Sequence, residues 1–136
     1  MIKIGTLTCL HSNNVCARVG CLKAFQNRSD FFDGYSPDTL LGAMMTCNGC
    51  KSANPKEPDV DEGILEKIDR LVSEEIKVMH VGACRLDREK KECPRIAKIC
   101  EMIESRGIQV VRGTHRESGN RIEKSYRGNF QADCGK

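Results

Sequence analysis

The chain has 136 residues, a length that suits one folded domain with a single hydrophobic core. It carries 22 lysines and arginines against 19 aspartates and glutamates, and this formal net charge of +3 falls short of the basic excess expected of a dedicated nucleic-acid binder. Nine residues are cysteines, a share below the about 8–10% that marks a small disulfide scaffold but too large to ignore.

The first half of the chain predicts two strands and a helix. Residues 2–8 alternate and then run apolar, which is typical of a short strand, and the polar cluster after Cys9 predicts a loop. Apolar side chains recur at helical spacing over residues 18–27. Residues 40–46 form an apolar run that predicts a strand buried on both faces of a parallel sheet. This longest clear run is far shorter than the about 18 residues of a membrane span.

The middle of the chain predicts a long loop, a helix and a strand. The loop covers residues 47–58, and the helix after it can be capped by Asp59 or Asp61. Its apolar face consists of Ile64, Leu65, Ile68, Leu71 and Val72. Strand character returns over residues 76–82, and a connection of mixed charge follows over residues 85–92.

The last third predicts one more helix and one more strand. Cys93-Pro94 opens the helix, with proline at the first helical position, and Gly107 ends it. The strand over residues 108–112 leads into Gly113-Thr114-His115. Residues 116–136 contain few large apolar side chains and form a polar C-terminal extension.

This alternation of strands and helices predicts an α/β fold, a single small flavodoxin-like or Rossmann-like domain. We expect a parallel four-stranded sheet with helices on both faces. Right-handed crossovers favour the strand order 2-1-3-4. The domain is expected to span residues 1–115, with residues 116–136 as an extension of the same domain.

The N-terminal residues predict the compartment, and the compartment decides what the cysteines can do. Residues 1–9 are too short and too interrupted for the apolar region of a signal peptide, so we expect a cytoplasmic protein. Thiols stay reduced there, and a cysteine-rich cytosolic chain more often binds metal or does redox chemistry than forms a disulfide framework. The odd number of cysteines points the same way.

Cysteines stand where three of the predicted strands end. Cys9 follows the first strand, Cys47 and Cys50 follow the second, and Cys84 follows the third. The carboxyl ends of parallel strands meet at one edge, where α/β sheets bind their ligands. Three adjacent strand ends span about 10 Å, within reach of one tetrahedral zinc ion. The sequence therefore predicts these four cysteines as zinc ligands.

A second tier of candidates lies near the same edge. Cys16 and Cys21 could supply two more ligands if their loop folds back over the site. His115 could serve a second centre, hydrogen-bond to a ligand, or transfer a proton. Cys93 stands at a helix N-terminus, where the helix dipole favours a thiolate and makes it a candidate ligand or nucleophile. The side chains interpreted as structural or incidental are Cys100, His80 and Cys134.

These positions resemble the CGGC-domain proteins, small proteins regarded as metal binders, with zinc as the expected metal. The resemblance covers roughly residues 1–115. It rests on Cys9, the Cys16/Cys21 pair, Cys47-Asn48-Gly49-Cys50, Cys84, Cys93-Pro94 and Gly113-Thr114-His115. Asn48 stands where the family has glycine, and asparagine also visits the left-handed backbone region. The resemblance implies metal binding and leaves the reaction open.

Several functions remain open at this point. An iron–sulfur cluster also needs four thiolates and is the alternative to zinc. A thiol-dependent redox enzyme would use Cys47/Cys50 or Cys93 as its nucleophile, although no helix N-terminus adjoins Cys50 in the sequence to activate it. A structural protein whose metal ties the loops together is the third possibility. The expected partners are a metal ion and a redox or electron-transfer protein, and neither a membrane nor a nucleic acid is expected.

Overall fold

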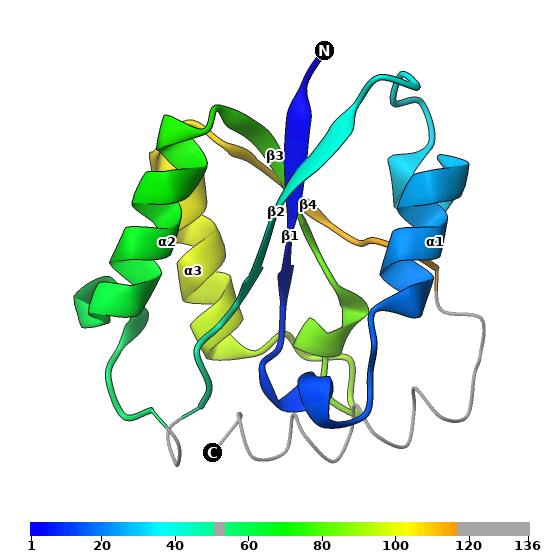
Figure 1. Cartoon of the computed structure of the whole chain (residues 1–136). Coiled ribbons are helices and arrows are strands. Elements are labelled where there is room, and N and C mark those ends of the chain that lie inside the picture. The colour runs from blue at the N-terminus through cyan, green and yellow to red at the C-terminus, as the bar shows by residue number, and fades with distance from the viewer. Residues whose placement is uncertain (51–53, 117–136) are drawn as a thin grey trace.

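The computed structural model describes residues 1–50 and 54–116. In this part of the chain, four parallel strands form one sheet in the order β2-β1-β3-β4 (Figure 1). The strands are β1 (Lys3–Thr8), β2 (Leu40–Thr46), β3 (Ile76–Val81) and β4 (Gln109–Arg112). The predicted α/β class and strand order are confirmed.

Helices cover both faces of the sheet, as predicted. They are α1 (Val19–Asn27), α2 (Glu62–Ser73) and α3 (Pro94–Ser105). Figure 1 shows α1 on one side of the sheet and α2 with α3 on the other. The larger apolar core includes the inward faces of α2 and α3, and a smaller one gathers Ile4 and Val78 of the sheet with Ala24 and Phe32.

The helix starts follow local chemistry that the sequence reveals. Asp61 caps α2, because its Oδ1 accepts hydrogen bonds from Gly63 N at 2.9 Å and Ile64 N at 3.4 Å. Pro94 is the first residue of α3, where its missing N–H costs nothing. Of the two caps expected for α2, Asp61 is therefore the one used.

The expectation that residues 40–46 are buried on both faces is wrong. Met45 is 5% exposed, but Leu40 and Met44 are 44% and 59% exposed. The reason is that the helices leave one face of this edge strand uncovered. An edge strand meets a neighbouring strand on one side only, and here one face of β2 also stays open, so an apolar run does not guarantee full burial.

His80 is fully buried against Phe32 of the smaller core, which confirms its interpretation as a core residue. It is fully buried in β3, with Nδ1 2.8 Å from Gly113 O and Nε2 2.8 Å from Tyr35 Oη. The Phe32 ring packs 4.3 Å from the imidazole, centroid to centroid. Burial lowers the pKa of His80, and the hydrogen bond to Gly113 offsets part of this effect.

Some predictions fall outside the described residues. They concern residues 51–53 of the loop after β2 and residues 117–136, which include Cys134 and nearly all of the predicted extension. In the part of the chain that the structure covers, we find no helix long and apolar enough to cross a membrane.

Candidate thiol site

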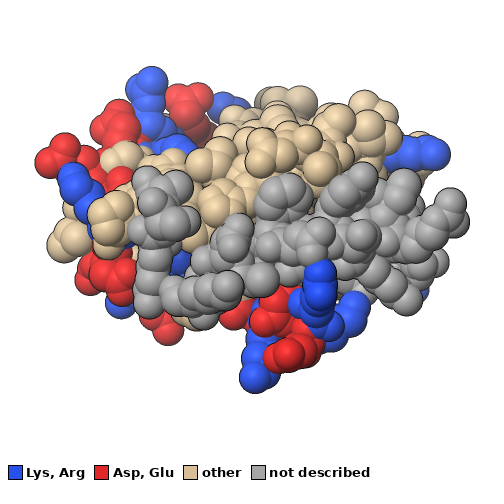
Figure 2. All heavy atoms as spheres, turned by 90° about the horizontal axis from the view of Figure 1, so that it is seen from below, with Lys and Arg blue, Asp and Glu red and all other residues tan. Residues whose placement is uncertain are grey.

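The four strands run in one direction, so their carboxyl ends share one edge, at the bottom of Figure 1. Cys9 directly follows β1, Cys47 directly follows β2, and Cys84 lies in the 3-10 turn after β3. Figure 2 views the molecule from this edge, and the charged side chains visible there lie toward its periphery. The structure thus brings three of the four predicted ligands to neighbouring strand ends.

Cys9 and Cys47 are neighbours across β1 and β2. Thr8 pairs with Thr46 in the strand register, so the two cysteines occupy the next position on each chain. The Cys47 amide donates to Thr8 O at 3.2 Å, which continues the strand pairing to the cysteines. Their thiols are hydrogen-bonded to each other, and both residues are fully buried.

Cys84 joins this pair through the backbone of Cys9. The Cys9 amide donates to Cys84 Sγ at 3.1 Å, and the next amide, that of Leu10, donates to Cys47 Sγ at 3.4 Å. Two consecutive amides after β1 therefore point at sulfurs from β2 and from the turn after β3. Amide hydrogen bonds of this kind stabilise negative charge on sulfur.

The site separates its thiols by protonation state. The hydrogen bond from Cys9 lowers the pKa of Cys47 to about 6, against the effect of burial, with further help from the amides of Leu10 and Gly49 and from Arg95. The same hydrogen bond raises the pKa of Cys9, and burial raises that of Cys84. Cys47 is therefore the thiolate of the group at neutral pH.

The turn after Cys47 uses the left-handed backbone region that asparagine and glycine can adopt. Asn48 and Gly49 both have positive φ angles, of 62° and 95°. Gly63 at the start of α2 leaves room for the Asn48 side chain, because a Cβ there would lie 2.7 Å from Asn48 Nδ2. Lys67 donates from α2 to Asn48 Oδ1 and to Thr46 O. Asparagine thus takes up the glycine-like conformation at this position.

The model of the CGGC domain family matches residues 3–115. This chain belongs to the CGGC domain family. The match spans all four strands and three helices, and it includes Cys47-Asn48-Gly49-Cys50 at the end of β2. No curated protein and no solved structure matches the chain.

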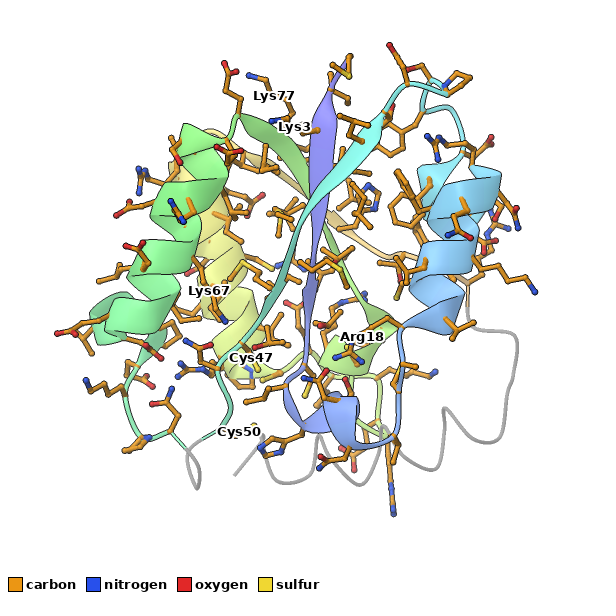
Figure 3. All side chains as sticks on the ribbon, viewed as in Figure 1. Lys3, Arg18, Cys47, Cys50, Lys67 and Lys77 are labelled. Carbon is orange, nitrogen blue, oxygen red and sulfur yellow. The ribbon has the colours of Figure 1, made fainter. Side chains whose placement is uncertain are left out.

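Two cations of this CGGC domain could not be placed at the site from its sequence. Arg95 Nε, from the first turn of α3, donates to Cys47 O at 2.6 Å. Arg18 is only 8% exposed, and its guanidinium donates to Cys9 O at 3.1 Å and to Asn13 Oδ1. In Figure 3, Arg18 and Lys67 lie on opposite sides of Cys47 along the sheet edge. Arg95 follows Cys93-Pro94, which marks a helix start but does not reveal what the arginine contacts.

Cys50 lies further out on the same edge (Figure 3). Its Sγ is 4.0 Å from His11 Nδ1. It is disulfide-bonded, whereas the seven other cysteines of the described residues are free thiols. A thiolate is the form that binds metal, so Cys50 could act as a ligand only after reduction.

The second-tier residues of this CGGC domain divide into three groups. Cys16 is exposed. Cys93 is buried at the start of α3, and burial raises its pKa despite the amides of Ile96 and Arg95, which lower it, so the expected effect of the helix N-terminus is outweighed. Cys21 pairs with His115 at the start of α1.

Cys100 is fully buried in α3, as its interpretation as a core residue predicts, and burial raises its pKa to about 11. Within residues 1–50 and 54–116, no three histidine, cysteine, aspartate or glutamate side chains already surround one point as metal ligands do.

Proposed function

We propose that this CGGC domain binds a zinc ion through Cys9, Cys47 and Cys84. The observation that carries the proposal is that the consecutive amides of Cys9 and Leu10 donate to the sulfurs of Cys84 and Cys47, while the Cys47 thiol is hydrogen-bonded to that of Cys9. Thiolates are preferred zinc ligands, and three protein ligands leave a fourth position for a further group. Cys50 is the candidate for that position once it is reduced.

The charges around the thiols suit a thiolate centre. Zinc with three thiolates carries a net charge of −1, which would be costly to bury without compensation. Arg95 and Lys67 act on Cys47, and Arg18 acts on Cys84. These side chains come from α3, α2 and the start of α1, so three separate elements direct positive charge at the sulfurs.

Zinc binding requires side-chain rotation, because the thiols of the described residues do not yet surround a common point. The backbone needs little movement. Cys9 and Cys47 extend a regular strand pair, whose backbones lie about 4.8 Å apart, and Cys84 is tied to the Cys9 amide. Sulfurs at zinc distances of about 2.3 Å are within reach of these positions by changes of χ1.

The test is the metal content of protein prepared under reducing, anaerobic conditions. We expect about one zinc per chain in the wild type, a large loss in Cys47→Ser, and an unchanged content in Cys100→Ser, its matched control. Both variants replace a fully buried thiol by a hydroxyl, but only Cys47 belongs to the proposed site. Equal losses in the two variants, or a folded wild type that takes up no metal, would contradict the proposal.

The same preparation distinguishes zinc from an iron–sulfur cluster. A cluster brings visible absorbance and acid-labile sulfide, and zinc brings neither. If the protein contains iron and acid-labile sulfide in proportion, the bound group is an iron–sulfur cluster and the proposal of zinc is wrong. The loss of metal in Cys47→Ser would then still locate the site.

A second candidate function is dithiol redox chemistry, favoured by the hydrogen bond between Cys9 and Cys47. Their register places the backbones about 4.8 Å apart, inside the Cα separation that a disulfide accepts. Cys47 is the thiolate and Cys9 the thiol, the arrangement of an attacking and a resolving cysteine. This pair replaces the Cys47/Cys50 pair as the best-supported dithiol, and a thiol–disulfide exchange protein would be its partner.

A further inference from the structure

Cys21 forms a second thiol centre, at the start of α1. Its Sγ lies 3.0 Å from Thr114 Oγ1 and is hydrogen-bonded to His115. Thr114 and His115 directly follow the loop residue Gly113 after β4, whereas the zinc proposal uses the ends of β1, β2 and β3. The topology therefore joins the start of α1 to the end of β4 at this point.

Gly20 makes this pairing possible. A Cβ at Gly20 would lie 2.9 Å from both Cδ2 and Nε2 of His115, so the imidazole packs directly on the backbone of α1. His115 Nδ1 lies 3.1 Å from Arg116 O. The ring is thus bound by the main chain on its Nδ1 side and presents its Nε2 edge to the first turn of α1.

The surroundings of Cys21 favour a thiolate. The titratable and charged groups that act on it are His115 after β4 and Arg18 before α1, and Cys21 itself raises the pKa of Cys84 after β3. Burial alone would raise the pKa of Cys21, but the hydrogen bonds from His115 and Thr114 and the charges of His115 and Arg18 lower it overall. Cys21 is also the third residue of α1, where the helix N-terminus supports negative charge.

Accessibility separates Cys21 from most of the other thiols. Cys9, Cys47, Cys93 and Cys100 are at most 3% exposed, whereas Cys21 is only partly buried. An attacking sulfur must be both ionised and reachable. Cys16 is reachable too, but its Sγ accepts only the Arg18 amide, at 3.4 Å, among the described residues.

We propose that Cys21 is a nucleophilic thiolate, held by His115 and Thr114, that attacks small disulfides. The Cys21 sulfur forms a bond to one sulfur of the disulfide, the original S–S bond breaks, and the second sulfur leaves as a thiolate that takes its proton from the imidazolium of His115 or from water. Cys21 ends as a mixed disulfide. No electrons are gained or lost by the pair of reactants as a whole.

The first test is the rate at which iodoacetamide alkylates each cysteine of the reduced full-length protein near neutral pH, mapped by peptide mass spectrometry. We expect Cys21 to react several-fold faster than Cys16, because the hydrogen bonds from His115 and Thr114 favour the thiolate form of Cys21. Glutathione disulfide is then expected to add one glutathione at Cys21. Equal rates at the two cysteines, or addition of glutathione elsewhere first, would overturn the proposal.

Two variants test the role of His115. His115→Gln removes the imidazole, and Gly20→Ala displaces it while improving the helix, because alanine has a higher helix propensity than glycine. We expect both variants to slow the alkylation of Cys21 several-fold near neutral pH. At high pH, where every thiol is ionised, the alkylation rate should be the same as in the wild type. A merely structural role would not give this pH-dependent loss, and a rate unaffected at neutral pH in both variants contradicts the proposal.

Repeating the alkylation with one equivalent of zinc separates this centre from the zinc site. We expect zinc to leave the rate at Cys21 unchanged. Protection of Cys21 from alkylation by zinc would show that it is a metal ligand and would overturn its role as a free nucleophile. If zinc does not bind at all, the zinc proposal fails, and the alkylation rates alone decide the proposal for Cys21.

Discussion

Arg95 Nη2 lies 2.7 Å from Asp61 Oδ2, and each of these side chains is 9% exposed. The pair connects the N-cap of α2 to the first turn of α3. Through Nε the same guanidinium holds Cys47 O at 2.6 Å. The buried ion pair therefore joins two helix starts to the end of β2, where the low-pKa thiol of the site lies.

Removal of one partner of this ion pair should be strongly destabilising. We expect Arg95→Met to lower the free energy of unfolding by about 3–5 kcal/mol, because it leaves the Asp61 carboxylate buried without its cation. Urea unfolding of the reduced protein measures the change. The control is the double variant Asp61→Asn/Arg95→Met, which should lose much less than the sum of the two single variants. Additive losses would show that the two side chains act independently.

Burial of His80 predicts a loss of stability as the pH falls. Its pKa in the folded protein is below that of an exposed histidine, so the unfolded chain binds a proton that the folded protein does not hold. Stability from this source is present above the unfolded pKa of about 6.5 and decreases below it. We expect His80→Gln to flatten the decline in unfolding free energy between about pH 7 and pH 5. If the unfolding free energy of His80→Gln falls as steeply with pH as that of the wild type, His80 is not the cause of the decline.

The positive φ at Asn48 predicts a difference between two substitutions. Asn48→Gly and Asn48→Ala both lose the hydrogen bond from Lys67, so the difference between them reports the backbone alone. Alanine is strained at φ 62° and glycine is not, so Asn48→Ala should be less stable than Asn48→Gly by about 1 kcal/mol. Chemical denaturation of both variants gives this value. Equal stability would place the residue in an unstrained conformation.

Mild oxidation of the metal-free protein should link Cys9 to Cys47. Their strand register and their thiol hydrogen bond give the pair a suitable geometry. Peptide mapping after oxidation with a defined glutathione buffer identifies the bond and its reduction potential. Cys9→Ser is expected to abolish it, whereas Cys100→Ser serves as the control that leaves it intact. A Cys47 disulfide to any other partner would refute this pairing.

Local sequence patterns were sufficient for the framework of the protein. Apolar periodicity predicted the strands and helices, Asp61 and Pro94 marked two helix starts, and the alternation of elements predicted the parallel order 2-1-3-4. These features depend on neighbours along the chain or on general rules of connection, which is why one sequence reveals them. The exposure of β2 was missed because it depends on what the helices leave uncovered.

The sequence by itself determined that cysteines stand at the ends of consecutive strands, since strand ends and residue types are both properties of the chain. The tertiary structure alone decided how those cysteines differ. Hydrogen bonds from one thiol and two amides, together with the charge of Arg95, lower the pKa of Cys47. Burial raises the pKa of Cys93 and outweighs the effect of its position at a helix N-terminus. Cys21 meets His115 across 94 positions of sequence, because α1 packs beside the end of β4. Charge, burial and hydrogen bonding act between segments that only folding brings together, so they decide the chemistry of each thiol.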